Sequence, residues 1–215
     1  MVDDKNEKKR KLTAAEQRRL KAYEAISEEL AAKGYHRTEL TVGIIRANIF
    51  AMILSIPVMA IGIVLFVIAN RGKEISWMSG RQMIVFVIAL LLLIVVHELI
   101  HGITWSIFTE HHFRDIEFGF MMEYLTPYCT CKSPLSKGKY IIGALMPLII
   151  LGIIPAAAGI LTGSMFWLLM GIIMILSAGG DILIVANIMK YKSSSEDVLY
   201  LDHPTQAGGV IFEKK

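Results

Sequence analysis

Cysteine is nearly absent from this sequence. Its 215 residues include two cysteines, Cys129 and Cys131, with a single residue between them. A disulfide framework needs several pairs of cysteines, so the fold is not expected to depend on one. The first forty residues are highly charged and contain no apolar core, so we expect no signal peptide there.

Charged residues are also scarce. They make up 19% of the sequence, whereas 54% of the residues are hydrophobic and the mean hydropathy is +0.55. An ordinary soluble domain is less apolar than this, and here the apolar residues are concentrated in long runs. The net charge is +3, and the basic residues are crowded at the N-terminus. This distribution favours a cytosolic face near anionic lipid over nucleic-acid binding.

Four apolar runs are long enough to cross a bilayer, which takes about 20 residues in a helix. They cover approximately residues 47–69, 82–108, 140–161 and 165–189. We therefore predict an all-α polytopic membrane protein with about four transmembrane helices. The expected division is an N-terminal arm (1–41), a four-span core (42–190) and a tail (191–215).

The N-terminal arm carries the signals of one amphipathic helix. Thr13 and Glu16 have the spacing of a capping box, and Gly34 is a favourable stop. Apolar residues recur between them at helical spacing, so the helix either packs on the bundle or lies on the membrane surface. The arm contains ten Lys and Arg residues and the short third loop contains none. With four spans, both termini are predicted to be cytosolic in a cell membrane.

The stretch His97-Glu98-Leu99-Ile100-His101 is the centre of the functional hypothesis. It follows the wholly apolar run 83–96, where ionisable side chains are costly and indicate function. Residues i and i+4 share one face of a helix, so His97 and His101 can bind one zinc ion while Glu98 acts as general base. The alternative is a pair of buried histidines that form hydrogen bonds without a metal.

A catalytic zinc ion needs a third protein ligand and leaves its fourth position to water. Asp181 is the acidic residue within the fourth apolar run, where an unpaired carboxylate would be expensive. His97 and Asp181 each lie about 15 residues into their runs, which is roughly 22–24 Å of helix, so their depths match. Gly179 and Gly180 would allow a close approach and could also loosen this helix.

Other residues remain open as third ligands. They are the loop carboxylates, the histidines outside the spans and the two cysteines, namely Glu117, Glu123, His111, His112, His203, Cys129 and Cys131. Most are expected to be solvated, packed or capping residues. Asn48 and Asn187 are candidates for an oxyanion donor, with helix packing as the alternative.

The segment 115–128 alternates apolar and polar residues from Ile116 onward, which predicts a β-hairpin-like loop between the second and third spans. Its edge could pair with an unwound substrate, or the hairpin could simply lie on the membrane surface. Pro127 would limit pairing on its side. The tail segments 198–201 and 209–212 are expected to form two short strands around a turn.

Several motifs together resemble a known family. They are HELIHG (97–102), Y-x-x-C-K-x-P-L-S (128–136), SAGGDILI (177–184) and LDHPT (201–205). This combination, over residues 94–212, resembles the bacterial zincin peptidase family known as a domain of unknown function. That family is similar to intramembrane metalloproteases of the site-2 type. The resemblance implies His97, His101 and Asp181 as zinc ligands and Glu98 as the catalytic carboxylate.

The sequence departs from the site-2 pattern at one point. Those proteases carry an Asn-Pro-containing motif that ends in Asp-Gly, whereas here the order is Gly-Gly-Asp with no Asn-x-x-Pro ahead of it. The leading hypothesis is a zinc-dependent intramembrane or membrane-proximal peptidase that cleaves membrane proteins or peptides. The alternatives are a non-catalytic membrane scaffold or adaptor, and a metal transporter.

The zinc hypothesis predicts a pH dependence. Imidazole binds zinc in its neutral form, and its ordinary pKa is about 6.5. Peptidase activity should therefore fall below about pH 6, because protonation of His97 and His101 removes two ligands. The measurement is the pH–rate profile of the purified protein, and a rate that stays constant down to pH 5 would contradict the hypothesis.

Overall fold

The structure, a computed structural model, describes residues 13–121 and 126–214. The predicted ligand candidate Glu123 lies outside the described residues. The α-helices are α1 (Ala14–Ala32), α2 (Ile44–Ala69), α3 (Gly80–Ser106), α4 (Lys137–Pro147), α5 (Ile154–Thr162), α6 (Met165–Ser177) and α7 (Gly179–Lys190). A 3-10 turn, η1 (His112–Asp115), and a π-helical segment, η2 (Leu148–Ile153), complete the helical elements.

The strands fall into two antiparallel sheets. The four-stranded sheet has the order β1-β6-β5-β4, and the two-stranded sheet pairs β2 with β3. The strands are β1 (Tyr35–Thr41), β2 (Ile116–Met121), β3 (Thr126–Cys131), β4 (Leu135–Ser136), β5 (Val198–Asp202) and β6 (Gly208–Lys214). The prediction of an all-α protein was therefore wrong in part, because residues of the arm, the loop and the tail assemble into sheets. Short strands that pair across the whole chain give no local signal of their partners.

Three helical segments are long and apolar enough to cross a membrane, and they are Ile45–Ala69, Gly80–Ser106 and Lys137–Thr162. The third contains Pro147 at the end of α4, the π-helical turn η2, and Pro155 in the first turn of α5. The fourth predicted span is a pair of helices, α6 and α7, bent by 49°. The bend falls at Ala178, directly before Gly179 and Gly180, which matches the loosening expected from those glycines.

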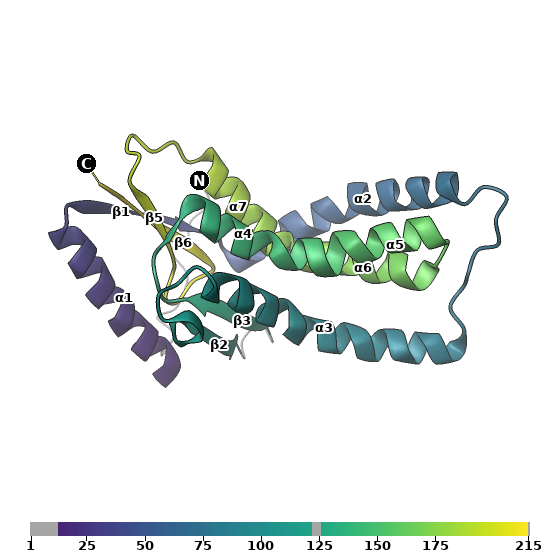
Figure 1. The fold of residues 1–215 in the computed structure, drawn as a ribbon, viewed down its shortest axis with the longest axis horizontal. Coiled ribbons are helices and arrows are strands. Elements are labelled where there is room, and N and C mark those ends of the chain that lie inside the picture. The colour runs from purple at the N-terminus through teal and green to yellow at the C-terminus, as the bar shows by residue number, and fades with distance from the viewer. Residues whose placement is uncertain (1–12, 122–125, 215) are drawn as a thin grey trace.

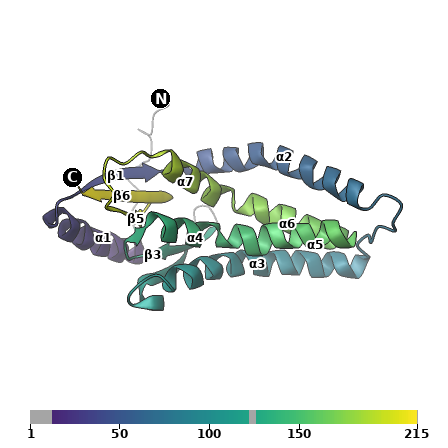
Figure 2. The ribbon, with the colours of Figure 1, turned by 45° about the horizontal axis from the view of Figure 1, so that its top comes forward.

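The apolar helices are arranged around a tight α5–α6 pair. Figures 1 and 2 show α5 and α6 side by side, with α2 on one side of them and α3 on the other. Small residues permit this approach. A Cβ at Gly159 would lie 2.2 Å from the backbone nitrogen of Leu168, and one at Gly171 would lie 2.2 Å from that of Ala156. The outward faces of α2 and α3 carry exposed Ile, Leu and Val side chains, as expected for helices in lipid.

Helix α1 packs on the four-stranded sheet. Its capping box is present, because the Thr13 hydroxyl accepts from Glu16 N–H and the Glu16 carboxylate accepts from Thr13 N–H. Tyr23 and Leu30 are buried against Leu201, Val210 and Phe212 of β5 and β6. The structure therefore supports the packed arrangement of this helix and identifies the sheet as its partner.

Strand β1 of the arm pairs along its length with β6 of the tail. The sheet lies at one end of the molecule, and the loop between α2 and α3 lies at the other (Figure 1). The described parts of the arm and of the tail therefore lie at the same end of the apolar helices. The two predicted tail strands are also confirmed as β5 and β6.

The predicted hairpin is confirmed as β2 and β3. In an antiparallel pair, alternate residues direct their backbone groups toward the partner strand. Lys132 N–H donates to Asp115 O, so the backbone of Lys132 is directed toward β2. By alternation, the backbone groups of Pro127, Cys129 and Cys131 point away from β2. The proline has no N–H, and the Cys131 N–H donates to a side chain of β5. Pro127 and Cys131 therefore offer no available N–H group at the outward edge of β3.

The close α5–α6 contact makes a prediction about stability. Gly171→Ala forces a methyl group into the Ala156 backbone and should lower the free energy of unfolding by about 1–3 kcal/mol. Gly138→Ala in α4 is the matched control, since nothing lies within 4 Å of a Cβ there. Thermal unfolding in detergent measures both variants, and equal stability of the two would contradict this packing.

Candidate metal centre

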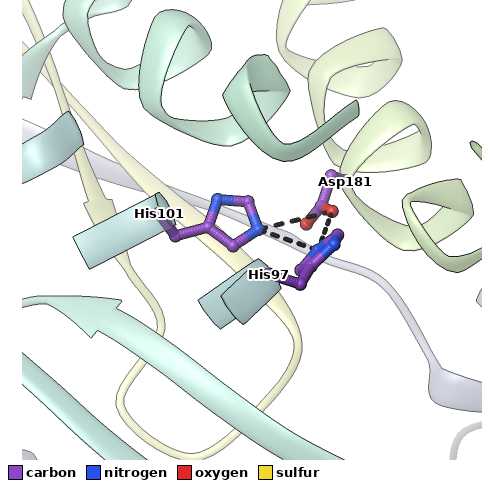
Figure 3. Close-up of side chains that lie close together, drawn as sticks. All are labelled: His97, His101 and Asp181. Atoms are coloured by element: carbon purple, nitrogen blue, oxygen red, sulfur yellow. Dashed lines mark hydrogen bonds and ion pairs between the residues drawn. The ribbon is translucent and has the colours of Figure 1, made fainter. Parts of the chain in front are cut away.

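Three side chains that could bind a metal ion converge in the middle of the molecule. His97 and His101 lie one turn apart on α3 and are 5% and 4% exposed. Asp181 comes from the first turn of α7. Figure 3 shows the two imidazole rings and the carboxylate pointing toward one another. Within the described residues, this is the single group of three His, Cys, Asp or Glu side chains whose ligand atoms all lie within 4.8 Å.

The distances fit one tetrahedral ion. His97 Nε2 lies 3.2 Å from Asp181 Oδ2 and 3.2 Å from His101 Nε2, and His101 Nε2 lies 3.5 Å from Asp181 Oδ2. In tetrahedral zinc sites with bonds of about 2.0–2.1 Å, neighbouring ligand atoms are about 3.3 Å apart. Two imidazole nitrogens and one carboxylate oxygen are also a donor set that zinc accepts.

His101 is held by an ordered set of neighbours. Its Nδ1–H donates to the Gly143 carbonyl of α4 at 2.9 Å, which leaves the lone pair of Nε2 directed at the other two ligands. The Trp105 ring stacks on the imidazole at 5.1 Å between centroids, and Trp105 Nε1–H donates to the Tyr140 carbonyl at 3.2 Å. A Cβ at Gly143 would lie 2.0 Å from Trp105 Nε1, so only glycine allows α4 to approach this closely.

His97 is held differently. Its Nδ1 is buried and has no hydrogen-bond partner among the described residues, whereas its Nε2 faces Asp181 and His101. The orientation of the His97 ring therefore depends on the contacts of its Nε2 with Asp181 Oδ2 and His101 Nε2. A shared cation would satisfy that arrangement, because all three donor atoms point at one place.

The bend in the fourth span brings Asp181 to the histidines. α6 ends at Ser177, and the new helix α7 begins at Gly179, so Asp181 sits in a first helical turn. That position favours a carboxylate, because the exposed N–H groups carry partial positive charge. Gly179 packs against Ala51 of α2, where a Cβ would lie 2.7 Å from the alanine methyl group.

The site opens into a cavity of about 530 Å³. Glu98 lines it beside the ligands, and Asn48 of α2, Tyr128 of β3 and Thr205 of the β5–β6 turn lie on its other walls. The Glu98 carboxylate also interacts with the backbone amide of Cys129. A carboxylate next to the ligands in a cavity of this size is placed where a general base would be needed.

The other predicted ligand candidates are occupied elsewhere. Glu117 of β2 forms an ion pair with Arg19 at 3.7 Å. His111 is exposed and faces Asp115, and His112 Nδ1 donates to the Ser106 carbonyl at 3.0 Å. None of these described side chains joins the group around His97.

Cys129, Cys131 and His203 are the remaining ligand candidates among the described residues. Burial raises the pKa of Cys131 to about 12 and raises that of Cys129 further, and neither thiol belongs to the group around His97. His203 Nδ1 accepts from the backbone N–H groups of Thr205 and Gln206. The capping interpretation of His203 is therefore supported, and burial lowers its pKa.

Sequence reasoning missed the residues that support the ligands. Trp105 is four residues beyond His101 and so lies on the same helix face, which was the available signal. Tyr140 and Asp202 could not be connected from the sequence, since they come from α4 and β5. Burial raises the pKa of Asp202 to about 6, although the hydrogen bonds from Tyr140 and Cys131 favour its carboxylate form and act to lower the pKa.

The comparison with protein families falls on this part of the chain. Residues 90–195 match the family model described as "Putative zincin peptidase". The resemblance inferred from the sequence is confirmed over this segment, which contains His97, Glu98, His101 and Asp181. No curated protein and no solved structure matches the chain. The zincin family name implies zinc, and the three converging side chains could hold it.

The geometry predicts which substitutions abolish metal binding. His101→Ala and Asp181→Asn should each weaken zinc binding by more than about 100-fold, because loss of even a supporting partner costs 10–100-fold. His111→Ala is the matched control, since this exposed histidine lies outside the group. Zinc content after dialysis and competition with a chelator measure the effect. Unchanged affinity in Asp181→Asn would exclude Asp181 as a ligand.

Proposed function

We propose that this protein is a zinc-dependent peptidase whose active site lies within or next to a membrane. Three observations support the proposal: the match to a zincin peptidase family, the converging ligand group, and the apolar helices that carry it. The observation that carries it is the meeting of His97, His101 and Asp181 beside Glu98 in one cavity.

Each residue of the site has an assigned role. His97, His101 and Asp181 hold the metal, which supplies polarisation of the scissile carbonyl and a lowered pKa for its water when bound. Glu98 accepts the proton of the attacking water and later donates it to the leaving amine. Asn48 lines the same cavity and supplies an amide that can bind a substrate carbonyl.

The expected substrate is a membrane protein or a peptide at the membrane surface. His97 and His101 occupy the last part of α3, nearer to the sheet than to the α2–α3 loop, so the site is expected toward the cytosolic side. The cavity is bordered by α2 and α3 and also by the β5–β6 turn and β3. A peptide can therefore reach the site between apolar helices and an extramembrane sheet, in the manner of a site-2-type protease.

The edge of β3 offers a limited surface for substrate pairing. Pro127 has no N–H group, the Cys129 N–H is directed at the Glu98 carboxylate, and the Cys131 N–H donates to Asp202. A substrate strand would have to pair through the carbonyl groups of this edge. Side-chain contacts in the cavity are thus expected to contribute most of the binding.

The proposed role of Glu98 is tested by Glu98→Gln. The variant should retain about one zinc per chain and lose cleavage by about 10²–10⁴-fold, since it keeps the shape of the side chain and removes the proton acceptor. The assay follows release of fragments from membrane proteins incubated with purified wild-type protein or variant. Full activity in Glu98→Gln would overturn the mechanism.

Removal of the metal provides the companion experiment. A chelator should abolish cleavage by the wild type, and added zinc should restore it. A wild-type protein without zinc, on which a chelator has no effect, would instead favour the metal-free histidine pair and a scaffold function.

A further inference from the structure

We infer that Asp202 is a positioning residue of this site, which ties the tail of the chain to both a metal ligand and the catalytic carboxylate. The inference rests on the proposed function. Asp202 ends β5 and lies on the wall of the cavity, outside the group of three ligands. Each of its carboxylate oxygens accepts one hydrogen bond from a buried part of the site.

The first connection leads to His101. Tyr140 Oη–H donates to Asp202 Oδ1 at 2.6 Å, and this tyrosine is 2% exposed. The Tyr140 carbonyl accepts from Trp105 Nε1–H, and Trp105 stacks on His101. One turn further along α4, the Gly143 carbonyl fixes the His101 tautomer. A shift of Tyr140 therefore moves both the stacking partner and the hydrogen-bond acceptor of this ligand.

The second connection leads to Glu98. Cys131 N–H donates to Asp202 Oδ2 at 2.8 Å, which anchors the outward edge of β3. Two residues earlier on the same edge, the Cys129 amide faces the Glu98 carboxylate. The carboxylate of Asp202 thus sets the distance of β3 from the active-site helix.

A carboxylate suits this position for a chemical reason. Both donors are buried, and a donor left without an acceptor there costs about 1–3 kcal/mol. A single carboxylate accepts from two directions at once, whereas a hydroxyl or an amide presents one acceptor oxygen. Burial raises the pKa of Asp202 to about 6, so the carboxylate form still predominates at pH 7.

The test compares Tyr140→Phe, Asp202→Asn and the double variant with the wild type. Tyr140→Phe removes one hydrogen bond and keeps the ring. Each single variant should weaken zinc binding by about tenfold and lower kcat by a similar factor with KM unchanged, as loss of an outer partner of a metal ligand does. The effect of Tyr140→Phe should be smaller in the Asp202→Asn background than in the wild type, because Asp202→Asn weakens the acceptor of the hydrogen bond that Tyr140→Phe removes.

Tyr200→Phe is the matched control. This buried tyrosine packs on Tyr140 at 6.1 Å between ring centroids, whereas the two hydrogen bonds to the Asp202 carboxylate come from Tyr140 and Cys131. The zinc affinity of Tyr200→Phe should equal that of the wild type. Replacement of zinc by cobalt(II) adds a spectroscopic measurement, since the visible bands of the bound ion should shift in Tyr140→Phe and stay unchanged in Tyr200→Phe.

The outcomes separate the two proposals. Zinc affinity and cobalt spectra that match the wild type in both Tyr140→Phe and Asp202→Asn would overturn the role of Asp202 alone. Fully multiplicative effects in the double variant would overturn the connection through Tyr140, because the two changes would then act independently. A folded wild-type protein that binds no zinc would overturn the proposed function itself.

Discussion

Ionisable side chains among apolar helices are stable only when they satisfy one another, and this constraint governs the arrangement of the chain. His97 and His101 on α3 and Asp181 on α7 would each be costly in isolation. Their ligand atoms meet within 4.8 Å. The packing of the other elements has to bring α3, α4 and α7 close enough for these side chains to make contact.

Irregular backbone geometry allows these helices to approach one another. The fourth span is bent by 49° between α6 and α7, and the bend starts a new helix whose first turn carries Asp181. The third span contains a π-helical turn between its two prolines. Glycines allow the contacts, since Gly143 admits the Trp105 ring and Gly179 admits Ala51. The break at Ala178 thus lies next to the group formed by His97, His101 and Asp181.

The four-stranded sheet also reaches this centre. β5 and β6 come from the tail, β1 from the arm and β4 from the segment before α4. Through Asp202, this sheet contacts Tyr140, which leads through Trp105 to His101, and Cys131, which lies two residues from the Cys129 amide that faces Glu98. Apolar helices offer few polar partners to a buried group of ionisable side chains, so a sheet at their end is a physical solution to that shortage.

The sequence by itself predicted the long apolar helices, the capping box of α1, the hairpin, and the placement of His97 and His101 on one face of a helix. These features depend on local patterns, namely run length, capping signals, alternation of residues and the i, i+4 spacing. Asp181 was also reached from the sequence, because an acidic side chain in an apolar run is costly without a partner and its depth matches that of His97.

Only the tertiary structure decided how these parts are joined. The pairing of β1 with β6, the break at Ala178, and the contacts of Asp202 with Tyr140 connect residues far apart in the chain. Such contacts are selected by which surfaces can pack and which buried donors find acceptors. No periodicity in one segment encodes its distant partner, so sequence patterns could point to His97, His101 and Asp181 but not to the framework that brings them together.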